Sequence, residues 1–221
     1  MKILYGSHSS KPLIFLSDTE KPSGLLIDIG AETAKRLKLE GKSIFSPRKR
    51  VLDFLITGKA DLVCNTRPAW HGNPDYLTFV ETVPDQDIYL TRTDTRFDFS
   101  NPRLLKGAKI GTILGFRYDK TFMKALNYGA NHNAVPGYTN IWAMLSRGRI
   151  DAVVVSKTAA QYHLMQGENK NTYTIVDAGS PKYMLYCAVM TKHRRKDEII
   201  AALNAMKSDG TLEKLYSKYR N

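Results

Sequence analysis

The apolar residues of this chain fall into short continuous runs, which are separated by segments with helical spacing. Continuous runs without polar alternation are typical of strands that are buried on both faces of a sheet. The segment LLIDIGAETAKRL instead repeats apolar residues at the spacing of a helix, and Pro47 opens a second segment of that kind. The order strand, helix, strand, helix, strand predicts a parallel α/β sheet in the first half. The predicted strands are 2–5, 42–46 and 60–65.

The second half of the chain repeats this order. KIGTIL predicts a strand, the segment that begins at Tyr118 predicts a helix, Pro136 precedes another strand-to-helix step, and DAVVV predicts a further strand. The runs 85–92 and 183–192 then lead out of the first and second halves. We therefore expect two small α/β lobes built in series.

One phrase is shared by the two halves. Gly58 and Gly148 lie 90 positions apart, and each comes three residues before an aspartate that opens an apolar run. Glycine accepts the left-handed conformation at the end of a helix. We interpret the phrase as a helix end that leads by the shortest link into a buried strand.

The chain ends with two amphipathic helical segments, which have no strand of their own. Their apolar positions recur at helical spacing within 199–206 and 212–219. A pair of helices with an apolar face must bury it against another element. We expect the pair to pack on an existing sheet.

The composition favours a globular protein with a basic surface. A chain of 221 residues with 43% hydrophobic residues is long enough to bury at least one core. The formal net charge of +12 would suit an anionic partner, but the basic residues are spread over the whole chain, with short clusters only at 48–50 and 192–196. No nucleic-acid-binding motif accompanies them, so we expect no nucleic-acid partner.

No stretch approaches the roughly 18 consecutive apolar residues that a membrane span requires. The start MKILYGSHSSKP breaks off too early to be the apolar region of a signal peptide. A methionine directly before the first predicted strand would also arise if a leader had been removed and a start codon added. The missing leader therefore says little about the compartment.

The order of these motifs resembles the bacterial extracellular solute-binding proteins of family 3, which serve amino-acid ABC importers. GLLIDIGAETAKRL, GKADL, LKGAKIGTILG and GRIDAVV are similar to motifs of that family and follow one another in its order. The tail IIAALNAMKSDGTLEKLYSKY is similar to the family's closing segment. The resemblance runs from end to end and implies the two-lobed type II periplasmic-binding-protein fold, an α/β fold.

In that fold each lobe is a mostly parallel sheet flanked by helices, and the chain crosses between the lobes twice. The resemblance implies a lobe of residues 1–89 with 184–221 and a lobe of residues 90–183. It also implies a small-molecule ligand in the interlobe cleft, hinge closure that the permease of an ABC transporter reads, a periplasmic location and a monomer. It implies no catalytic residue, no cofactor and no metal.

The two charged anchors that family members use for α-amino acids are missing. Such members take an arginine from the first lobe for the carboxylate and an aspartate from the second lobe for the ammonium group. Counted without gaps, Asn73 stands at the arginine's place and Ser156 at the aspartate's. An ammonium group without a partner in a closed cleft would lose roughly 1 to 3 kcal/mol. We therefore expect an amino-acid-like or anionic organic solute rather than an ordinary zwitterionic amino acid.

Three arginines could bind an acidic group of the ligand instead. Arg117 stands where the family has a small hydroxyl residue, at a predicted helix N-terminus whose N–H groups and dipole favour an anion. Arg67 follows the third predicted strand and could substitute for the missing arginine, and Arg50, near the start of a helix, is the third candidate. A guanidinium can bind a carboxylate or phosphate through two hydrogen bonds. Each arginine could equally be a solvated surface residue.

Further candidates lie after the predicted strands. Asn65 and Thr66 match family positions that hydrogen-bond the ligand, at the carboxyl end of a strand, where open α/β sheets bind ligands. His8 and its two neighbours stand where the family often has an aromatic platform, which is missing here. Trp142 lies on an apolar helix face and is expected in the core. The predicted ligand-binding residues are Ser9, Ser10, Asn65, Thr66, Arg67, Trp70, Gly115, Phe116, Arg117, Tyr118 and Ser156. Apolar contacts would come from Trp70, Phe116 and Tyr118, each of which could also be ordinary packing.

Two other functions stay open. The same two-lobed module also occurs as a ligand-sensing domain without a transporter. Some relatives are enzymes, for example cyclohexadienyl dehydratases, which need a carboxylate or histidine as general acid. Asp75, Glu81, His8 and His71 are available for that role but form no recognisable constellation.

The two cysteines, Cys64 and Cys187, lie in apolar strand-like runs and lack the close pairing of a zinc site. Two buried thiols are therefore our first expectation. The family resemblance places the two strands side by side, so a cross-strand disulfide is the alternative in an oxidising periplasm. It requires that the two Cα atoms lie within about 7 Å of each other.

Overall fold

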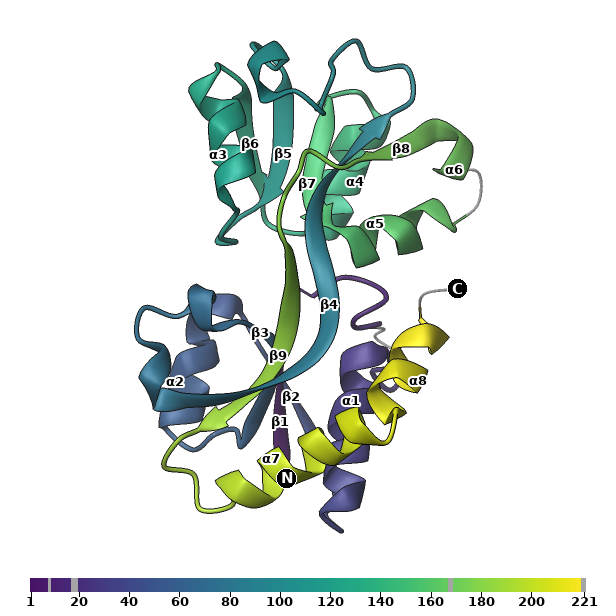
Figure 1. Cartoon of the computed structure of the whole chain (residues 1–221). Helices are drawn as coiled ribbons and strands as arrows, with labels where there is room; N and C mark the ends of the chain where they lie inside the picture. Colours follow the sequence, from purple (N-terminus) through teal and green to yellow (C-terminus); the bar gives the residue numbers. More distant parts are fainter. Residues whose placement is uncertain (8, 17–19, 167–168, 220–221) are drawn as a thin grey trace. The chain divides into compact units, whose positions relative to one another are not determined.

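The computed structural model describes residues 1–7, 9–16, 20–166 and 169–219. Contacts between residues divide the chain into unit 1, Met1–Pro84 with Met184–Asn221, and unit 2, Asp85–Tyr183 (Figure 1). The chain leaves unit 1 within strand β4 (Leu77–Arg92) and returns to it within strand β9 (Lys182–Met190). The sequence placed the return at residue 184 and the first crossing at residue 89, later in the same strand.

Unit 1 contains both ends of the chain. Its other strands are β1 (Lys2–Gly6), β2 (Lys42–Ser46) and β3 (Leu62–Thr66). Its α-helices are α1 (Leu25–Arg36), α2 (Val51–Ile56), α7 (Lys196–Ser208) and α8 (Thr211–Lys218), and its short 3-10 helices, labelled η, are η1 (Arg48–Arg50), η2 (Pro68–Trp70) and η3 (Pro74–Tyr76). The strand order is β2–β1–β3–β9, with β1, β2 and β3 parallel and β9 antiparallel to β3. The first part of β4 lies beside β9, where the Thr82 hydroxyl donates to the Leu185 carbonyl at 2.9 Å. Helix α2 lies on one side of this sheet, and α1, α7 and α8 lie on the other (Figure 1).

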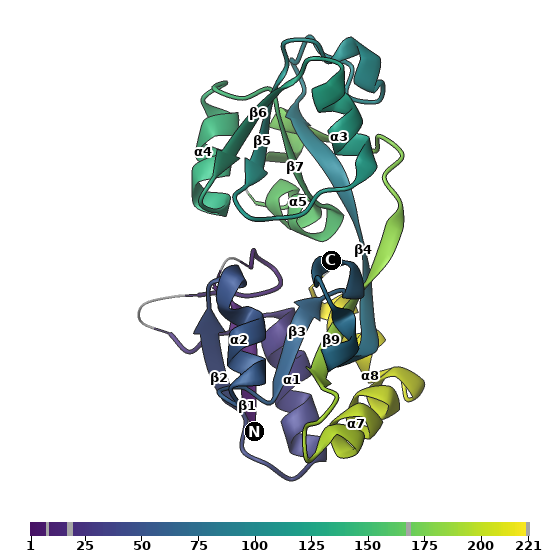
Figure 2. The same cartoon turned by 90° about the vertical axis from the view of Figure 1, so that its left-hand side faces the viewer.

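Unit 2 repeats the arrangement with one more antiparallel pairing. Its elements are η4 (Pro102–Leu104), β5 (Lys109–Ile113), α3 (Lys120–Asn127), β6 (Asn131–Val135), α4 (Tyr138–Ser146), β7 (Ala152–Ser156), α5 (Lys157–Leu164), α6 (Asn169–Thr172) and β8 (Tyr173–Val176). Strand β5 runs parallel to both β6 and β7, whereas β4 pairs antiparallel with β7 and with β8. Figure 2 shows α3 and α4 on opposite sides of these strands.

The core of unit 2 explains why its strands read as continuous apolar runs. Val153 and Val155 of β7 are packed in a cluster with α4, whereas Ala152 and Val154 are packed in a cluster with Phe122 of α3. Successive side chains of a strand point to opposite faces, and helices cover both faces here. Each residue of the run therefore meets an apolar layer, and no polar alternation remains.

The phrase shared by the two halves has the same structure in both units. Gly58 and Gly148 adopt φ values of +66° and +63°. The Asp61 carboxylate then accepts the backbone N–H of Lys2, and the Asp151 carboxylate that of Lys109, both at 2.7 Å. The backbone N–H of each aspartate donates in return to the carbonyl of the same lysine, at 2.9 and 2.8 Å. Each aspartate thus fixes the start of the strand that follows it, β3 or β7, against a neighbouring parallel strand, β1 or β5.

Two expectations about the elements need correction, and a third needs an addition. Strand β4 has 16 residues, whereas the sequence indicated only its second half, 85–92. Strand β6 ends before Pro136, although we placed the strand after it, because NHNAV has a single buried residue and no apolar signal. The terminal helices pack on α1 as well as on the sheet. Arg36 of α1 pairs with Asp209 at 2.7 Å and Asp28 of α1 with Lys218 of α8 at 2.8 Å, whereas Lys207 of α7 pairs with Glu81 of β4 at 2.7 Å and the Tyr216 hydroxyl of α8 donates to the Pro84 carbonyl of β4 at 3.3 Å.

The two cysteines form a disulfide, so the first expectation of buried free thiols is wrong. Cys64 of β3 and Cys187 of β9 are directly opposed in the antiparallel pair, and their Cα atoms are 4.0 Å apart. Both are buried. The bond joins two strands that are 123 residues apart in sequence, and it is the alternative that the family resemblance allowed. No helix within the described ranges is long and apolar enough to cross a membrane.

The shared aspartates generate a stability prediction. Asp151→Ala should lower the free energy of unfolding by about 1 kcal/mol, because the exposed start of β5 loses a charged acceptor for the Lys109 N–H. Asp61→Ala should have a similar effect in unit 1. Asp197→Ala, which removes a side chain that is 91% exposed, is the control and should change stability by about 0.5 kcal/mol at most. Urea unfolding followed by circular dichroism measures all three, and an Asp151→Ala loss no larger than the control contradicts this role.

The disulfide gives a second prediction. Reduction should lower the free energy of unfolding by an amount on the order of 4 kcal/mol, because the bond closes a long loop in the unfolded chain. Urea unfolding with and without dithiothreitol measures the loss. The double variant Cys64→Ser with Cys187→Ser is the control and should be insensitive to the reductant. Two reactive thiols in the denatured, unreduced protein would exclude the bond.

Candidate functional site

Unit 1 has a cavity of about 170 Å³ at the carboxyl ends of its three parallel strands. The residues that follow β1, β2 and β3 reach it from separate loops. Carboxyl ends of parallel strands are where open α/β sheets bind ligands. The cavity is lined by Gly6, Ser9, Arg48, Lys49, Val51, Leu52, Val63, Cys64, Asn65, Thr66, Trp70, His71 and Gly72. Four predicted ligand-binding residues, Ser9, Asn65, Thr66 and Trp70, are among them.

Asn65 interrupts the strand that carries it into the cavity. Cys64 opposes Cys187 and Thr66 opposes Tyr186, so Asn65 is the extra residue of a β-bulge. Its φ is +65°, a left-handed conformation that asparagine tolerates better than most residues. The disulfide thus closes the last regular pair of the strand, and the bulge directly after it turns the chain into the loop that lines the cavity.

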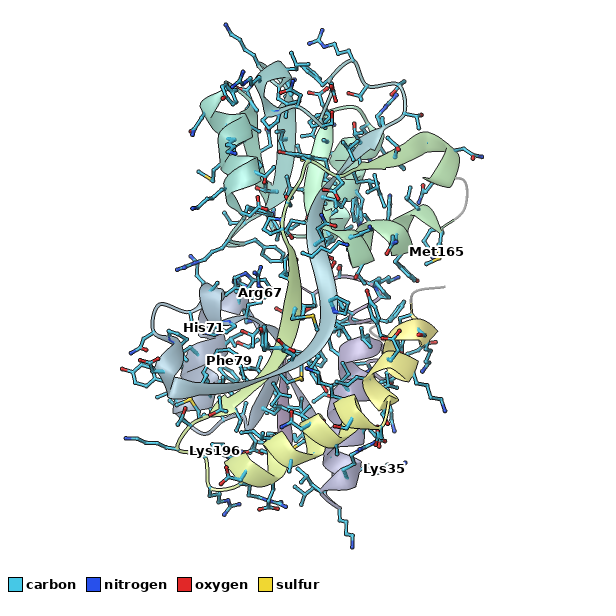
Figure 3. The ribbon with its side chains drawn as sticks, viewed as in Figure 1. Lys35, Arg67, His71, Phe79, Met165 and Lys196 are labelled. Carbon is cyan, nitrogen blue, oxygen red and sulfur yellow. A yellow bond between two sulfur atoms is a disulfide. The ribbon has the colours of Figure 1, made fainter. Side chains whose placement is uncertain are left out.

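Thr66 and His71 hold this loop together. The Thr66 hydroxyl and the His71 Nε2 are 2.7 Å apart, and both residues line the cavity. The His71 ring lies 5.8 Å from that of Phe79, which in turn meets Tyr186 of β9 edge-on at 5.9 Å. Figure 3 shows Arg67, His71 and Phe79 on the same side of unit 1. The loop is therefore anchored to β4 and β9 through a row of aromatic rings.

Two arginines lie over the ring of Trp70. The guanidinium carbon of Arg48 lies 4.8 Å from the centre of the Trp70 ring, and that of Arg67 lies 5.6 Å from it. Arg67 and, as a third candidate, Arg50 were predicted to bind an acidic group, but Arg48 was not. Arg50 is exposed and does not line the cavity, whereas Arg48 does. The rule that selected Asn65, proximity to the carboxyl end of a strand, would have selected Arg48 after β2.

Ser9 and Ser10 follow β1. The Oγ atoms of both are buried, and neither has a hydrogen-bond partner among the described residues. Ser9 lines the cavity, whereas Ser10 is 7% exposed and does not reach it. A buried hydroxyl without a partner is costly, so the Ser9 hydroxyl is suited to accept or donate a hydrogen bond to a ligand. His8 lies outside the described residues.

The predicted residues of unit 2 form a separate group. Gly115 has a φ of +82°, and the Phe116 ring lies 6.3 Å from that of Tyr118 and 6.5 Å from that of Tyr138. The Tyr118 hydroxyl accepts the backbone N–H of Ile113 at 2.7 Å, so it fixes the loop after β5. Gly115, Phe116 and Tyr118 thus shape one loop, and their contact with a ligand stays a prediction.

Arg117 lies outside the helix whose N-terminus was expected to favour an anion. Helix α3 begins at Lys120, and the Asp119 carboxylate already accepts the N–H groups of Thr121 and Phe122, at 2.8 and 3.2 Å. A negative charge at this N-cap disfavours a second anion there. The expectation of an open helix N-terminus at Arg117 is therefore wrong. Arg117 is exposed, and its role in binding stays a prediction.

Ser156 is engaged at the start of α5. Its hydroxyl accepts the N–H of Ala159 at 3.2 Å, so it is the N-cap of that helix. It also bonds to the Asp85 carboxylate, which accepts the N–H groups of Gln86 and Thr158 at 2.9 and 3.2 Å. Burial raises the pKa of Asp85 above its usual value, although these hydrogen bonds oppose the rise. Ser156 therefore joins α5 to β4, and a role in ligand binding stays a prediction.

The remaining candidates have structural partners. Asn73 caps η3 by accepting the N–H of Asp75 at 3.0 Å, and Glu81 pairs with Lys207 at 2.7 Å. Trp142 is half-buried and stacks on His163, with ring centres 4.2 Å apart, as expected of a packing residue. Among the described residues, no group of three or more His, Cys, Asp or Glu side chains is arranged to hold a metal ion.

These features agree with one family of proteins. The bacterial extracellular solute-binding proteins, family 3, match this chain over residues 3–221. The chain belongs to this family. The family expectation from the motif order is thereby confirmed.

Two individual proteins are similar to this chain over most of its length. The chain is 26% identical over 202 residues to the L-cystine-binding protein TcyA of Bacillus subtilis (strain 168), covering 91% of this chain and 74% of TcyA. It is 23% identical over 210 residues to the histidine-binding periplasmic protein of Escherichia coli (strain K12), covering 89% of this chain and 78% of that protein.

Two solved structures confirm the fold. The GluR0 ligand-binding core complexed with L-glutamate matches with a TM-score of 0.80 at 14% identity, over 100% of this chain and 97% of that chain. The ancestral amino acid-binding protein AncCDT-1, a precursor of cyclohexadienyl dehydratase, matches with a TM-score of 0.80 at 21% identity, over 100% of this chain and 95% of that chain. The fold is that of type II periplasmic binding proteins.

The environment of Asp85 predicts a pH dependence. A folded-state pKa above the unfolded value means that the contribution of Asp85 to stability is full below the unfolded pKa and is lost as the pH rises through the folded pKa. Wild type should therefore lose stability relative to Asp85→Asn as the pH rises from about 4 towards neutrality. Urea unfolding of both proteins at several pH values measures the difference, in which other groups cancel. If the stability of wild type relative to Asp85→Asn stays constant or increases as the pH rises, the hydrogen bonds to the Asp85 carboxylate outweigh its burial.

Proposed function

We propose that this protein binds a small amino-acid-like or anionic organic solute and delivers it to an ABC importer. The cavity at the carboxyl ends of β1, β2 and β3 in unit 1 carries this proposal. It combines a hydroxyl without a partner at Ser9, an amide at Asn65 and an aromatic surface at Trp70. Such a mixture of a few polar groups with apolar walls is typical of sites for small organic molecules.

The relatives support a ligand of amino-acid size. Their names assign L-cystine to TcyA and histidine to the periplasmic protein of E. coli. The anchoring charges are nevertheless different here, since Asn73 and Ser156 are uncharged and serve as caps of η3 and α5. We therefore propose a solute that does not depend on those anchors.

The disulfide supports an oxidising compartment. Disulfides persist in secreted and periplasmic proteins and are rare where glutathione keeps thiols reduced. The Cys64–Cys187 bond and the extracellular character of the family fit a periplasmic location. Closure of the two units on a ligand, read by a permease, is the step that the family resemblance implies for import.

A thermal-shift screen tests the proposal. A solute that binds only the folded state at about 100 times its Kd adds roughly 2.7 kcal/mol of stability, which should raise Tm by about 5 °C or more. The screen compares amino acids, dicarboxylates, phosphorylated metabolites and small peptides, with glucose as the negative control. No shift with any of these classes contradicts the proposal.

Asn65→Gly is a matched variant for that screen. Glycine adopts the positive φ of this position at least as easily as asparagine, so the variant removes the amide without straining the bulge. Its Tm without ligand should stay close to that of wild type, and its ligand-induced shift should be smaller. Uptake of the same labelled solute by cells with and without the gene separates import from the sensing and dehydratase alternatives.

A further inference from the structure

We propose that the cavity of unit 1 binds an acidic group, and that the solute therefore carries a net negative charge. This inference rests on the proposed solute-binding function and specifies its ligand class. The group would lie beside Trp70, with the guanidinium groups of Arg48 and Arg67 as its charged partners. A carboxylate or a phosphate ester would provide such an acidic group.

The charged side chains among the described residues that line the cavity are basic. Arg48 and Lys49 line it, and Arg67 approaches the same Trp70 ring from the next loop. Among the described residues that line the cavity, none is an aspartate or a glutamate. Like charges that are brought together in a partly buried space raise the local positive potential, which an anion lowers and a cation increases.

The indole ring orients the two guanidinium groups before a ligand arrives. Arg48 and Arg67 lie 4.8 and 5.6 Å from the ring centre, within the range of a cation–π interaction. A guanidinium that stacks on an aromatic face keeps its N–H donors in its own plane, where they can reach an acidic group side-on. Side chains that are ordered in advance lose less entropy when they bind.

Neutral donors complete the site. The buried Ser9 Oγ has no hydrogen-bond partner within the described part of the chain, and Ser9 and Asn65 both line the cavity. A carboxylate or phosphate oxygen would accept a hydrogen bond from each of them. A ligand oxygen that accepts from the Ser9 hydroxyl would remove the free-energy cost of leaving that buried hydroxyl without a hydrogen bond, whereas a purely apolar ligand group would not.

The size of the cavity limits what enters it. Its volume of about 170 Å³ is below the roughly 300 to 1,000 Å³ of sites that enclose a whole ligand. We therefore expect one acidic end of the solute to fill the cavity while the remainder lies outside it. A neutral or basic amino acid could insert its single carboxylate, but it would bring an ammonium group with it, so its net charge of zero or above would offset the lining cations less than an anionic solute does.

Isothermal titration calorimetry tests the inference on the full chain. The probes are succinate, L-glutamate and glycerol 3-phosphate as acidic solutes, with L-glutamine and L-histidine for comparison. At least one acidic probe should bind more tightly than both comparison probes, and more weakly as salt is added. Comparing the affinity for the two carboxylate probes with that for glycerol 3-phosphate shows which kind of acidic group the cavity prefers.

Variants then locate the binding. Arg48→Ala and Arg67→Ala should each weaken the best acidic probe about tenfold to a hundredfold, since each removes a charge-assisted partner. Arg48→Lys should retain part of the affinity because it keeps the charge. Arg50→Ala removes the same charge from an exposed neighbour outside the cavity and should change affinity less than about twofold. Unchanged unfolding midpoints show that the variants are folded.

Several results would overturn the inference. Tighter binding of glutamine or histidine than of every acidic probe would do so while leaving solute binding intact. So would equal losses in Arg48→Ala and Arg50→Ala, because the effect would then be general surface charge. Binding of no acidic probe also rejects the anionic class, and the broader thermal-shift screen then decides separately whether the protein binds solutes at all.

Discussion

The pairing of β3 with β9 at the Cys64–Cys187 disulfide is the constraint on which the candidate site depends. Directly after the bonded pair, Asn65 bulges out of the ladder with a positive φ, and Thr66 resumes the pairing opposite Tyr186. The residues that follow reach the cavity because the strand ends at this point. A covalent bond and a bulge therefore place polar groups that a regular strand would have pointed alternately to its two faces.

The two units also share one structural motif at the start of a strand. Each unit has a glycine with positive φ and, three residues later, an aspartate whose carboxylate accepts the backbone N–H at the start of a neighbouring strand, that of Lys2 in β1 or of Lys109 in β5. The motif could be predicted from the sequence because a positive φ favours glycine and the exposed N–H at the strand start needs a side-chain acceptor such as aspartate. The strands and helices with strong apolar periodicity were predicted from that periodicity. Strand β6 was misplaced because its polar residues leave no such signal, and only pairing with β5 defines it.

The site was predicted in part. Asn65, Thr66, Trp70 and Ser9 lie together because the carboxyl ends of parallel strands meet at one edge of a sheet. Arg48 follows the end of β2, so the same rule would have predicted it, whereas only the 3-10 turn Arg48–Arg50 decides that Arg48 and Lys49 line the cavity and Arg50 does not. The helix N-terminus near Arg117 was misjudged for a similar reason, since Asp119 takes the cap position that decides its charge.

We infer that a solute binds at Trp70, in the cavity at the end of β3. The indole N–H resonance of Trp70, assigned against Trp142 with a Trp70→Phe variant, reports on this directly in a ¹H–¹⁵N spectrum. Titration with the solute that gives the largest thermal shift should move the Trp70 signal with the same midpoint that calorimetry gives. Saturating binding by calorimetry while the Trp70 resonance stays in place would contradict the account.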